Sequence, residues 1–118
     1  MPTELLIVDD DPRFRVLARA LLEASGYAVV AEAADGAQAI AASQRCRLDA
    51  ALIDVQLPDT DGLALAHRLR ETHPHLRIVL TSADRTLVPP AALTETEAMA
   101  FVPKDELAIT DLAPLIGG

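Results

Sequence analysis

Short apolar runs alternate along this chain with longer segments of helical period. The apolar runs with the length of strands cover residues 5–8, 28–33, 50–53, 77–81 and 100–102. The third run is apolar throughout, as expected for a strand that is covered on both faces. Between the runs, apolar residues recur three and four positions apart. This spacing predicts helices over residues 12–25 and 36–45 and a third helix that ends before Pro74.

Capping and turn residues set the ends of these helices. Asp11 can act as an N-cap, and Pro12 suits the first helical position. The loop at residues 57–62 is rich in turn-forming residues. Within it, Asp59 and Asp61 are expected to shape the loop and to cap the third helix.

The C-terminal part of the chain has a weaker helical pattern. Pro89 and Pro90 forbid a regular helix through the first half of this stretch, although residues 91–99 can form two turns. Asp105 can cap a last helix that runs through Leu112. We therefore expect an irregular fourth helix and a short fifth helix.

The alternation of strands and helices predicts an α/β fold with a parallel sheet and right-handed crossovers. The usual solution at this size is a flavodoxin-like, doubly wound, five-stranded sheet of order 2-1-3-4-5. Residues 1–118 are expected to form a single domain. In this order strands one and three are neighbours, and the crevice where the winding reverses lies at their carboxyl ends.

Ionisable side chains follow three of the apolar runs. Asp9 and Asp10 come directly after the first run, Asp54 after the third, and Lys104 shortly after the fifth. The expected strand order therefore brings three carboxylates and one ammonium to one edge of the sheet. Carboxylates that crowd together repel one another unless a cation joins them. This pattern predicts a Mg²⁺ site with a reactive aspartate.

Composition narrows the classes of function. The chain has 118 residues, 51% of them hydrophobic, and a net charge of −8. This acidity argues against direct binding to nucleic acid or to an anionic membrane surface. The chain has no apolar run of the roughly 20 residues needed to span a bilayer and no basic segment typical of a signal peptide. Its single cysteine, Cys46, suits a reducing cytoplasm, where we expect the protein to act.

The cluster is suited to phosphoryl transfer. A carboxylate can attack phosphorus and form an acyl phosphate, provided that positive charge surrounds the transferring oxygens. Lys104 can supply part of that charge. Thr81 and Ser82 end the fourth apolar run and offer a hydroxyl that can donate to a phosphoryl oxygen.

The sequence resembles the receiver domain of bacterial two-component response regulators. The segments that carry the resemblance appear in the order and at the spacing of the family, and they are residues 6–12, 54–62, 78–83 and 101–104. Two adjacent aspartates alone would be weak evidence for this family, whereas the presence of all the segments at the family spacing is specific for it.

The resemblance implies a role for each residue of the cluster. Asp54 would be the phosphoacceptor, and Lys104 would contact the phosphoryl group. Asp10, Asp54 and the backbone carbonyl of Gln56 would bind Mg²⁺ directly, with Asp9 acting mainly through a metal-bound water.

Two further residues match the switch positions of the family. Ser82 matches the switch hydroxyl, because the small residue Ala83 follows it, and Thr81 is the competing choice. Phe101 matches the aromatic residue whose ring turns inward when the hydroxyl moves.

The resemblance also implies partners. A histidine kinase or phosphotransfer protein would donate the phosphoryl group, and the chain would relay the signal to a partner or an output domain. The run from Phe101 to Leu107 is similar to that of receivers attached to DNA-binding effector domains, so a C-terminal effector domain is one possible partner. A second copy of the chain, forming a homodimer, is another. Apart from catalysing its own phosphorylation and dephosphorylation, the chain is expected not to be an enzyme.

Two other interpretations remain. A Mg²⁺-dependent phosphohydrolase would usually carry a second acid two residues after the nucleophile, where this chain has Gln56. A receiver-like interaction module that is never phosphorylated would typically lack an acid or the lysine, and this chain keeps both. Pro89 and Pro90 favour the second alternative, because they interrupt the region through which many receivers signal.

Overall fold

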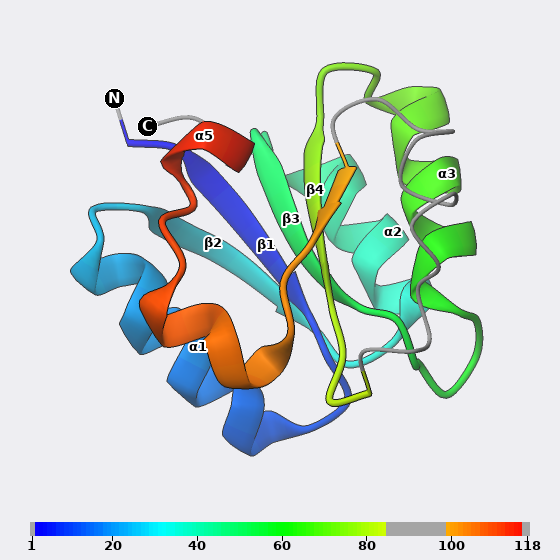
Figure 1. Ribbon diagram of the computed structural model, residues 1–118. Coiled ribbons are helices and arrows are strands. Elements are labelled where there is room, and N and C mark those ends of the chain that lie inside the picture. The colour runs from blue at the N-terminus through cyan, green and yellow to red at the C-terminus, as the bar shows by residue number, and fades with distance from the viewer. Residues whose placement is uncertain (1, 85–98, 117–118) are drawn as a thin grey trace.

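The structure is a computed structural model that describes residues 2–84 and 99–116. Within these ranges the strands form one parallel sheet in the order β2-β1-β3-β4-β5 (Figure 1), as predicted. The strands are β1 (Glu4–Val8), β2 (Ala28–Ala33), β3 (Ala50–Asp54), β4 (Arg77–Thr81) and β5 (Met99–Phe101). The helices are α1 (Pro12–Ala24), α2 (Gly36–Arg45), α3 (Gly62–Thr72), the 3₁₀ helix η2 (Lys104–Ile109) and α5 (Ala113–Ile116).

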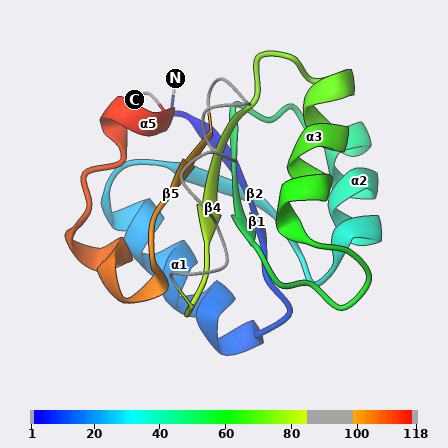
Figure 2. The ribbon, with the colours of Figure 1, turned by 45° about the vertical axis from the view of Figure 1, so that its right-hand side comes forward.

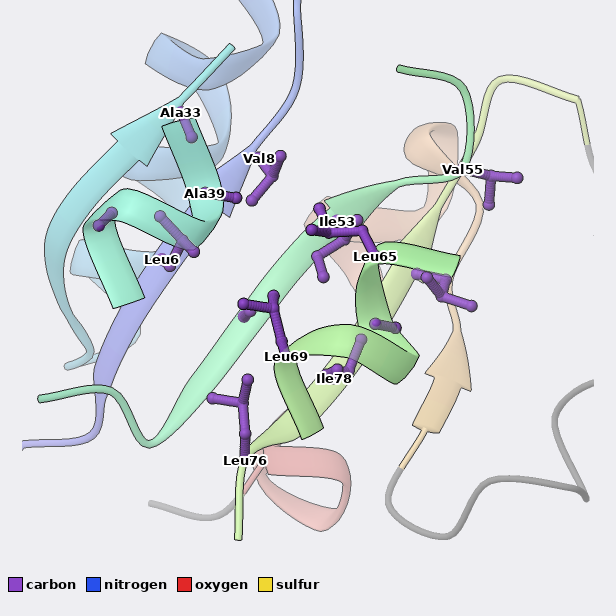
Figure 3. Close-up of a cluster of buried hydrophobic side chains, with 14 residues drawn as sticks. Leu6, Val8, Ala33, Ala39, Ile53, Val55, Leu65, Leu69, Leu76 and Ile78 are labelled. Atoms are coloured by element: carbon purple, nitrogen blue, oxygen red, sulfur yellow. The ribbon is translucent and has the colours of Figure 1, made fainter. Parts of the chain in front are cut away.

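Helices cover both faces of the sheet. Figures 1 and 2 show α1, η2 and α5 on one face and α2 and α3 on the other. Figure 3 shows the core beneath α2 and α3, where Leu65 and Leu69 pack with Ile53 and Ile78. Because both faces are covered, β3 is buried along its whole length.

The register of the strands sets where their carboxyl ends lie. Val8 of β1 pairs with Ile53 of β3, and Asp54 of β3 pairs with Thr81 of β4. The residues that follow β1 and those that end β3 and β4 therefore emerge at the same edge of the sheet.

Aspartates begin the helices that follow β1, β2 and β3. The carboxylate of Asp11 accepts a hydrogen bond from the backbone N–H of Arg13, as expected for the predicted N-cap. Asp35 caps α2 in the same way, and Asp61 caps α3 by accepting from Ala64. The start of each of these helices is therefore set by the carboxylate of the aspartate that precedes it.

The expected short fifth helix is present as α5, but the predicted cap and bounds of the last helix were wrong. The structure has no side-chain cap from Asp105 and no continuous helix to Leu112; instead η2 ends at Ile109 and α5 begins at Ala113. The hydroxyl of Thr110 donates to the carbonyl oxygen of Glu106 at 2.7 Å, the acceptor that the Thr110 N–H would use in a continuing α-helix. Thr110 itself is extended, with ψ near 129°.

The strand and the fourth helix predicted before this region have different outcomes. The predicted strand at 100–102 is β5, one residue nearer the N-terminus. The expectations for Pro89, Pro90 and the fourth helix lie outside the described residues.

Candidate functional site

The site lies where β1 and β3 end. Asp9 and Asp10 directly follow β1, and Asp54 is the last residue of β3. The backbone N–H of Asp9 still donates to the carbonyl oxygen of Ala33 on β2, at 3.0 Å, so the neighbouring strand holds this position. One carboxylate oxygen from each aspartate lies within 4.8 Å of one from each of the other two.

Burial differs among the three carboxylates. Asp9 is fully buried and Asp54 is 6% exposed, whereas Asp10 is exposed to solvent. Asp9 Oδ1 accepts from the N–H of Asp11 at 2.9 Å, and Asp54 Oδ1 accepts from the N–H of Gln56 at 3.0 Å. Burial raises the pKa of Asp9, and the charge of Asp54 adds to this rise, while hydrogen bonds from Lys104 and from the Asp11 N–H oppose it.

Lys104 joins the two buried carboxylates. Its Nζ lies 2.7 Å from Asp9 Oδ2 and 3.1 Å from Asp54 Oδ2. Burial alone would lower the pKa of Lys104, but its hydrogen bonds to Asp9 and Asp54 outweigh burial, and the pKa is raised above 10.5. The backbone N–H of Lys104 donates to the carbonyl oxygen of Ser82 at 3.1 Å, which fixes the start of η2 against the end of β4.

Both candidate hydroxyls lie at this edge. Thr81 ends β4 and Ser82 follows it, and both residues are buried. Ser82 Oγ accepts from the N–H of Asp84 at 3.0 Å, and a hydroxyl that accepts a hydrogen bond can still donate one. Thr81 Oγ1 is buried and has no hydrogen-bond partner among the described residues.

Phe101 and Gln56 lie at the margins of the cluster. Phe101 ends β5, pairs with Leu80 of β4, and is half-buried against the core under α2 and α3. Gln56 is exposed; its backbone pairs with Asp61 across the loop after β3, and its N–H binds Asp54. The contacts of Gln56 therefore tie this loop to the carboxylate of Asp54.

The loop after β3 depends on a close approach of two backbones. A Cβ atom at Gly62 would clash with the carbonyl oxygen of Asp54 and would lie 2.8 Å from the Cα of Val55. The N–H of Gly62 donates to the carbonyl oxygen of Val55 at 2.7 Å. Glycine at this position therefore lets α3 begin directly against the end of β3.

Asp59 has a different partner from the one predicted. Its carboxylate accepts from the N–H groups of Gly36 at 2.8 Å and Ala37 at 3.0 Å, at the first turn of α2 rather than of α3. These hydrogen bonds, first that of Gly36, lower the pKa of Asp59 below its ordinary 3.8. Asp59 thus ties the loop after β3 to a neighbouring helix that is distant in sequence.

Sequence reasoning missed two residues of the first helix. Lys104 Nζ lies over the ring of Phe14, 4.4 Å from its centroid. Arg15 Nη1 donates to the carbonyl oxygen of Asp9 at 2.6 Å, and Arg15 Nε pairs with Glu32 at 3.2 Å. The sequence places Phe14 and Arg15 in the first turn of a helix that starts at the sheet edge, which puts both near the site. It does not show which residues they contact.

The donor set fits a small divalent cation. Carboxylate oxygens are the hard ligands that Mg²⁺ prefers, and the site offers three carboxylates, one of them open to solvent. Lys104 balances only part of their charge. The residues at this edge are therefore chemically suited to hold Mg²⁺ beside Asp54.

Comparison with known proteins identifies the family. The family model described as "Response regulator receiver domain" matches residues 5–113. The chain belongs to the response regulator receiver domain family. The resemblance inferred from the sequence is therefore confirmed, and so is its assignment to two-component signalling.

Individual relatives agree with this assignment. The chain is 35% identical over 104 residues to "Response regulator MprA" of Mycobacterium sp. strain KMS, covering 88% of this chain and 45% of that protein. It is 39% identical over 80 residues to "Transcriptional regulatory protein ResD" of Bacillus subtilis, covering 68% of this chain and 33% of that protein. The chain thus spans less than half the length of these two curated relatives.

The fold has a similar solved counterpart. The structure of a two-component response regulator of the LuxR family from Aurantimonas sp. SI85-9A1 superimposes with a TM-score of 0.84 at 29% identity. The match covers 99% of this chain and 87% of that chain.

Among residues 2–84 and 99–116, no helix combines the length and the apolar character that crossing a bilayer requires.

Proposed function

We propose that this chain is a phosphorylation-dependent signalling switch that accepts a phosphoryl group on Asp54. The observation that carries the proposal is the position of Asp54, a buried carboxylate that lies beside Asp9 and Asp10 with Lys104 Nζ at 3.1 Å. The donor would be a phosphohistidine on a kinase or phosphotransfer protein, as the family implies.

The chemistry is a displacement at phosphorus. A carboxylate oxygen of Asp54 attacks the phosphorus atom, and an O–P bond forms as the P–N bond to the donor histidine breaks. The electron pair of the broken bond stays on the imidazole nitrogen, which takes up a proton from water. Lys104 then lies within reach of the phosphoryl oxygens and stabilises their charge.

The acidic residues have a separate task. Asp9, Asp10, Asp54 and the carbonyl oxygen of Gln56 would hold Mg²⁺, which when bound supplies positive charge to the transferring phosphoryl oxygens. Asp9 is itself held in place by the hydrogen bond from Asp11 and by the contact between Arg15 and its carbonyl oxygen.

The switch would act through a hydroxyl at the end of β4. Ser82 and Thr81 are both candidates, since the Ser82 hydroxyl accepts from Asp84 and can still donate, and Thr81 Oγ1 has no partner among the described residues. Donation to a phosphoryl oxygen on Asp54 would move the end of β4, and Phe101 on the paired strand would follow. Phosphorylation would thus shift the population between two states of this edge.

The test is transfer from a small phosphoryl donor. Wild-type protein incubated with acetyl phosphate and Mg²⁺ should gain one phosphoryl group in intact mass, and hydroxylamine should remove it. The Asp54→Asn protein should gain none, whereas Glu71→Gln, which removes an exposed carboxylate on α3, should behave like the wild type. Equal incorporation by Asp54→Asn and the wild type contradicts the proposal.

The switch has its own test. Beryllium fluoride with Mg²⁺ should shift the amide signals of Asp54 and Phe101 in the wild type. Ser82→Ala and Thr81→Val should differ, and the variant in which the Phe101 shift is lost identifies the hydroxyl. Unchanged Phe101 signals in the wild type would argue against a switch at this edge.

The phosphorylated chain would pass its signal to an effector. One relative is named as a transcriptional regulatory protein, and the chain spans only 33% of it. We propose that the chain controls an attached or separate effector rather than turning over a substrate. Sustained release of phosphate from simple phosphate monoesters would contradict this assignment.

A further inference from the structure

Phe14 places an aromatic face against the ammonium of Lys104. It occupies the first turn of α1 and is 9% exposed, and it packs with Ala18, Val102 and Leu107 beneath that helix. Lys104 Nζ lies 4.4 Å from the centroid of its ring. The ring is held in place by its own core contacts, so it presents a fixed surface to the lysine.

Lys104 therefore has three partners from three parts of the chain. Two are the carboxylates of Asp9 and Asp54, at 2.7 and 3.1 Å, and the third is the ring of Phe14. The face of an aromatic ring carries partial negative charge and attracts a cation that lies within about 6 Å of the centroid. A lysine side chain has a flexible four-carbon stem, so the place of its ammonium depends on such contacts.

We propose that Phe14 is a positioning residue for Lys104 in the phosphorylation of Asp54. This inference rests on the proposed function and adds a residue to it. The carboxylate of Asp54 changes its charge and shape when it accepts a phosphoryl group, whereas the ring of Phe14 does not. The ring holds the ammonium at the site throughout the reaction, so that less ordering is needed as charge develops on the phosphoryl oxygens.

An aliphatic residue would fill the same space without this attraction. Leucine at position 14 would still pack against the core cluster but would present no negative face to Lys104. The proposal therefore separates the electrostatics of the ring from its volume, and the experiment must do the same.

The decisive test is a series of fluorinated phenylalanines introduced at position 14 alone. Fluorine withdraws electron density from the ring face and weakens cation binding while changing the ring volume little. The initial rate of phosphorylation by acetyl phosphate with Mg²⁺ should fall stepwise from phenylalanine through the mono-, di- and trifluorinated forms. We expect a total decrease of about two- to tenfold, corresponding to the usual strength of a lysine–ring contact.

A matched pair of ordinary variants supports this series. Phe14→Leu should slow phosphorylation by a similar factor. Tyr27→Leu is the control, because Tyr27 is also 9% exposed and belongs to the same core cluster. Both variants should lose stability in thermal unfolding, but only Phe14→Leu should change the rate.

The geometry has an independent spectroscopic signature. In the wild type the ring current of Phe14 should move the side-chain methylene protons of Lys104 next to Nζ upfield, and Phe14→Leu should return them to ordinary values. A phosphorylation rate that does not change along the fluorinated series, or lysine signals at ordinary positions in the wild type, overturns the proposal. A wild-type protein that accepts no phosphoryl group at all instead overturns the proposed function.

Discussion

Replacing Lys104 with methionine tests the electrostatic reasoning about the site. Methionine keeps most of the apolar stem and removes the cation that joins Asp9 and Asp54. Both carboxylates are almost completely buried, and the Lys104 side chain is only 21% exposed. Removing one partner of a buried ion pair costs about 3–5 kcal/mol, and we expect the lower end, about 3 kcal/mol, because Lys104 keeps some contact with water.

This cost converts to a shift in melting temperature. An unfolding entropy of about 2.1 cal/mol/K per residue gives roughly 0.25 kcal/mol/K for a chain of this length. In chelator at pH 7, Lys104→Met should therefore melt about 12 °C below the wild type. Mg²⁺ should recover more stability in the variant than in the wild type, because it replaces the missing positive charge between the carboxylates.

The pH dependence has a definite sign. Without Lys104, the pKa of Asp9 should rise further, so that the folded variant takes up a proton more readily than the unfolded chain. The stability gap between variant and wild type should therefore narrow as the pH falls through that raised pKa. In the wild type, the raised pKa of Lys104 contributes stability below about pH 10.5, which is lost as the pH rises through its higher folded value.

The outcome that refutes this reasoning is clear. If Lys104→Met and the wild type have equal melting temperatures in chelator at pH 7, the carboxylates do not depend on the lysine for their compensation. Adding Asp9→Asn to Lys104→Met is the control, since it removes one buried charge and should restore part of the lost stability.

Three further predictions concern the structure around the site. Gly62→Ala should lower the unfolding free energy measured in urea by about 2 kcal/mol or more, because its Cβ would clash with backbone atoms at the end of β3; a change below about 0.5 kcal/mol would contradict that contact. Asp59→Asn should flatten the acid limb of the stability curve, since the depressed pKa of Asp59 gives stability that is present above about pH 4 and is lost as the pH falls through its lower folded value; an unchanged acid limb would exclude its capping of α2. Leu69→Ala should cost about 2–5 kcal/mol in the same urea assay, whereas Leu17→Ala on α1, with Leu17 53% exposed, should cost much less, and similar losses would contradict the assigned core.

The sheet and the acidic part of the site were open to prediction from local patterns. The strands are short apolar runs, and their alternation with helices restricts the topology to few solutions. Once the order was set, the carboxyl ends of β1 and β3 had to meet, so Asp9, Asp10 and Asp54 had to lie close together. Each of these steps depends on residues that are near in sequence or on a general rule of parallel sheets.

The errors arose where a residue has a choice of partners. Asp59 has the sequence position of a residue that shapes its own loop, yet its carboxylate binds the first turn of α2. Asp105 has the type of an N-cap, yet η2 starts without a side-chain cap and Thr110 ends it. The geometry of neighbouring elements decides between such partners, and a local pattern does not contain it.

Periodicity, capping and motif spacing are local properties, so the amino-acid sequence was enough to predict the strands, the aspartates that follow them, and the family of the chain. The position of Lys104 between Asp9 and Asp54, with its ammonium over the ring of Phe14, depends instead on how the chain packs in three dimensions. That arrangement joins Asp9, which follows β1, with residues of α1, β3 and η2, across 95 positions of sequence from Asp9 to Lys104. Such contacts form when the packed sheet brings the strand ends together, because a charged side chain buried there must pair with the opposite charges within its reach.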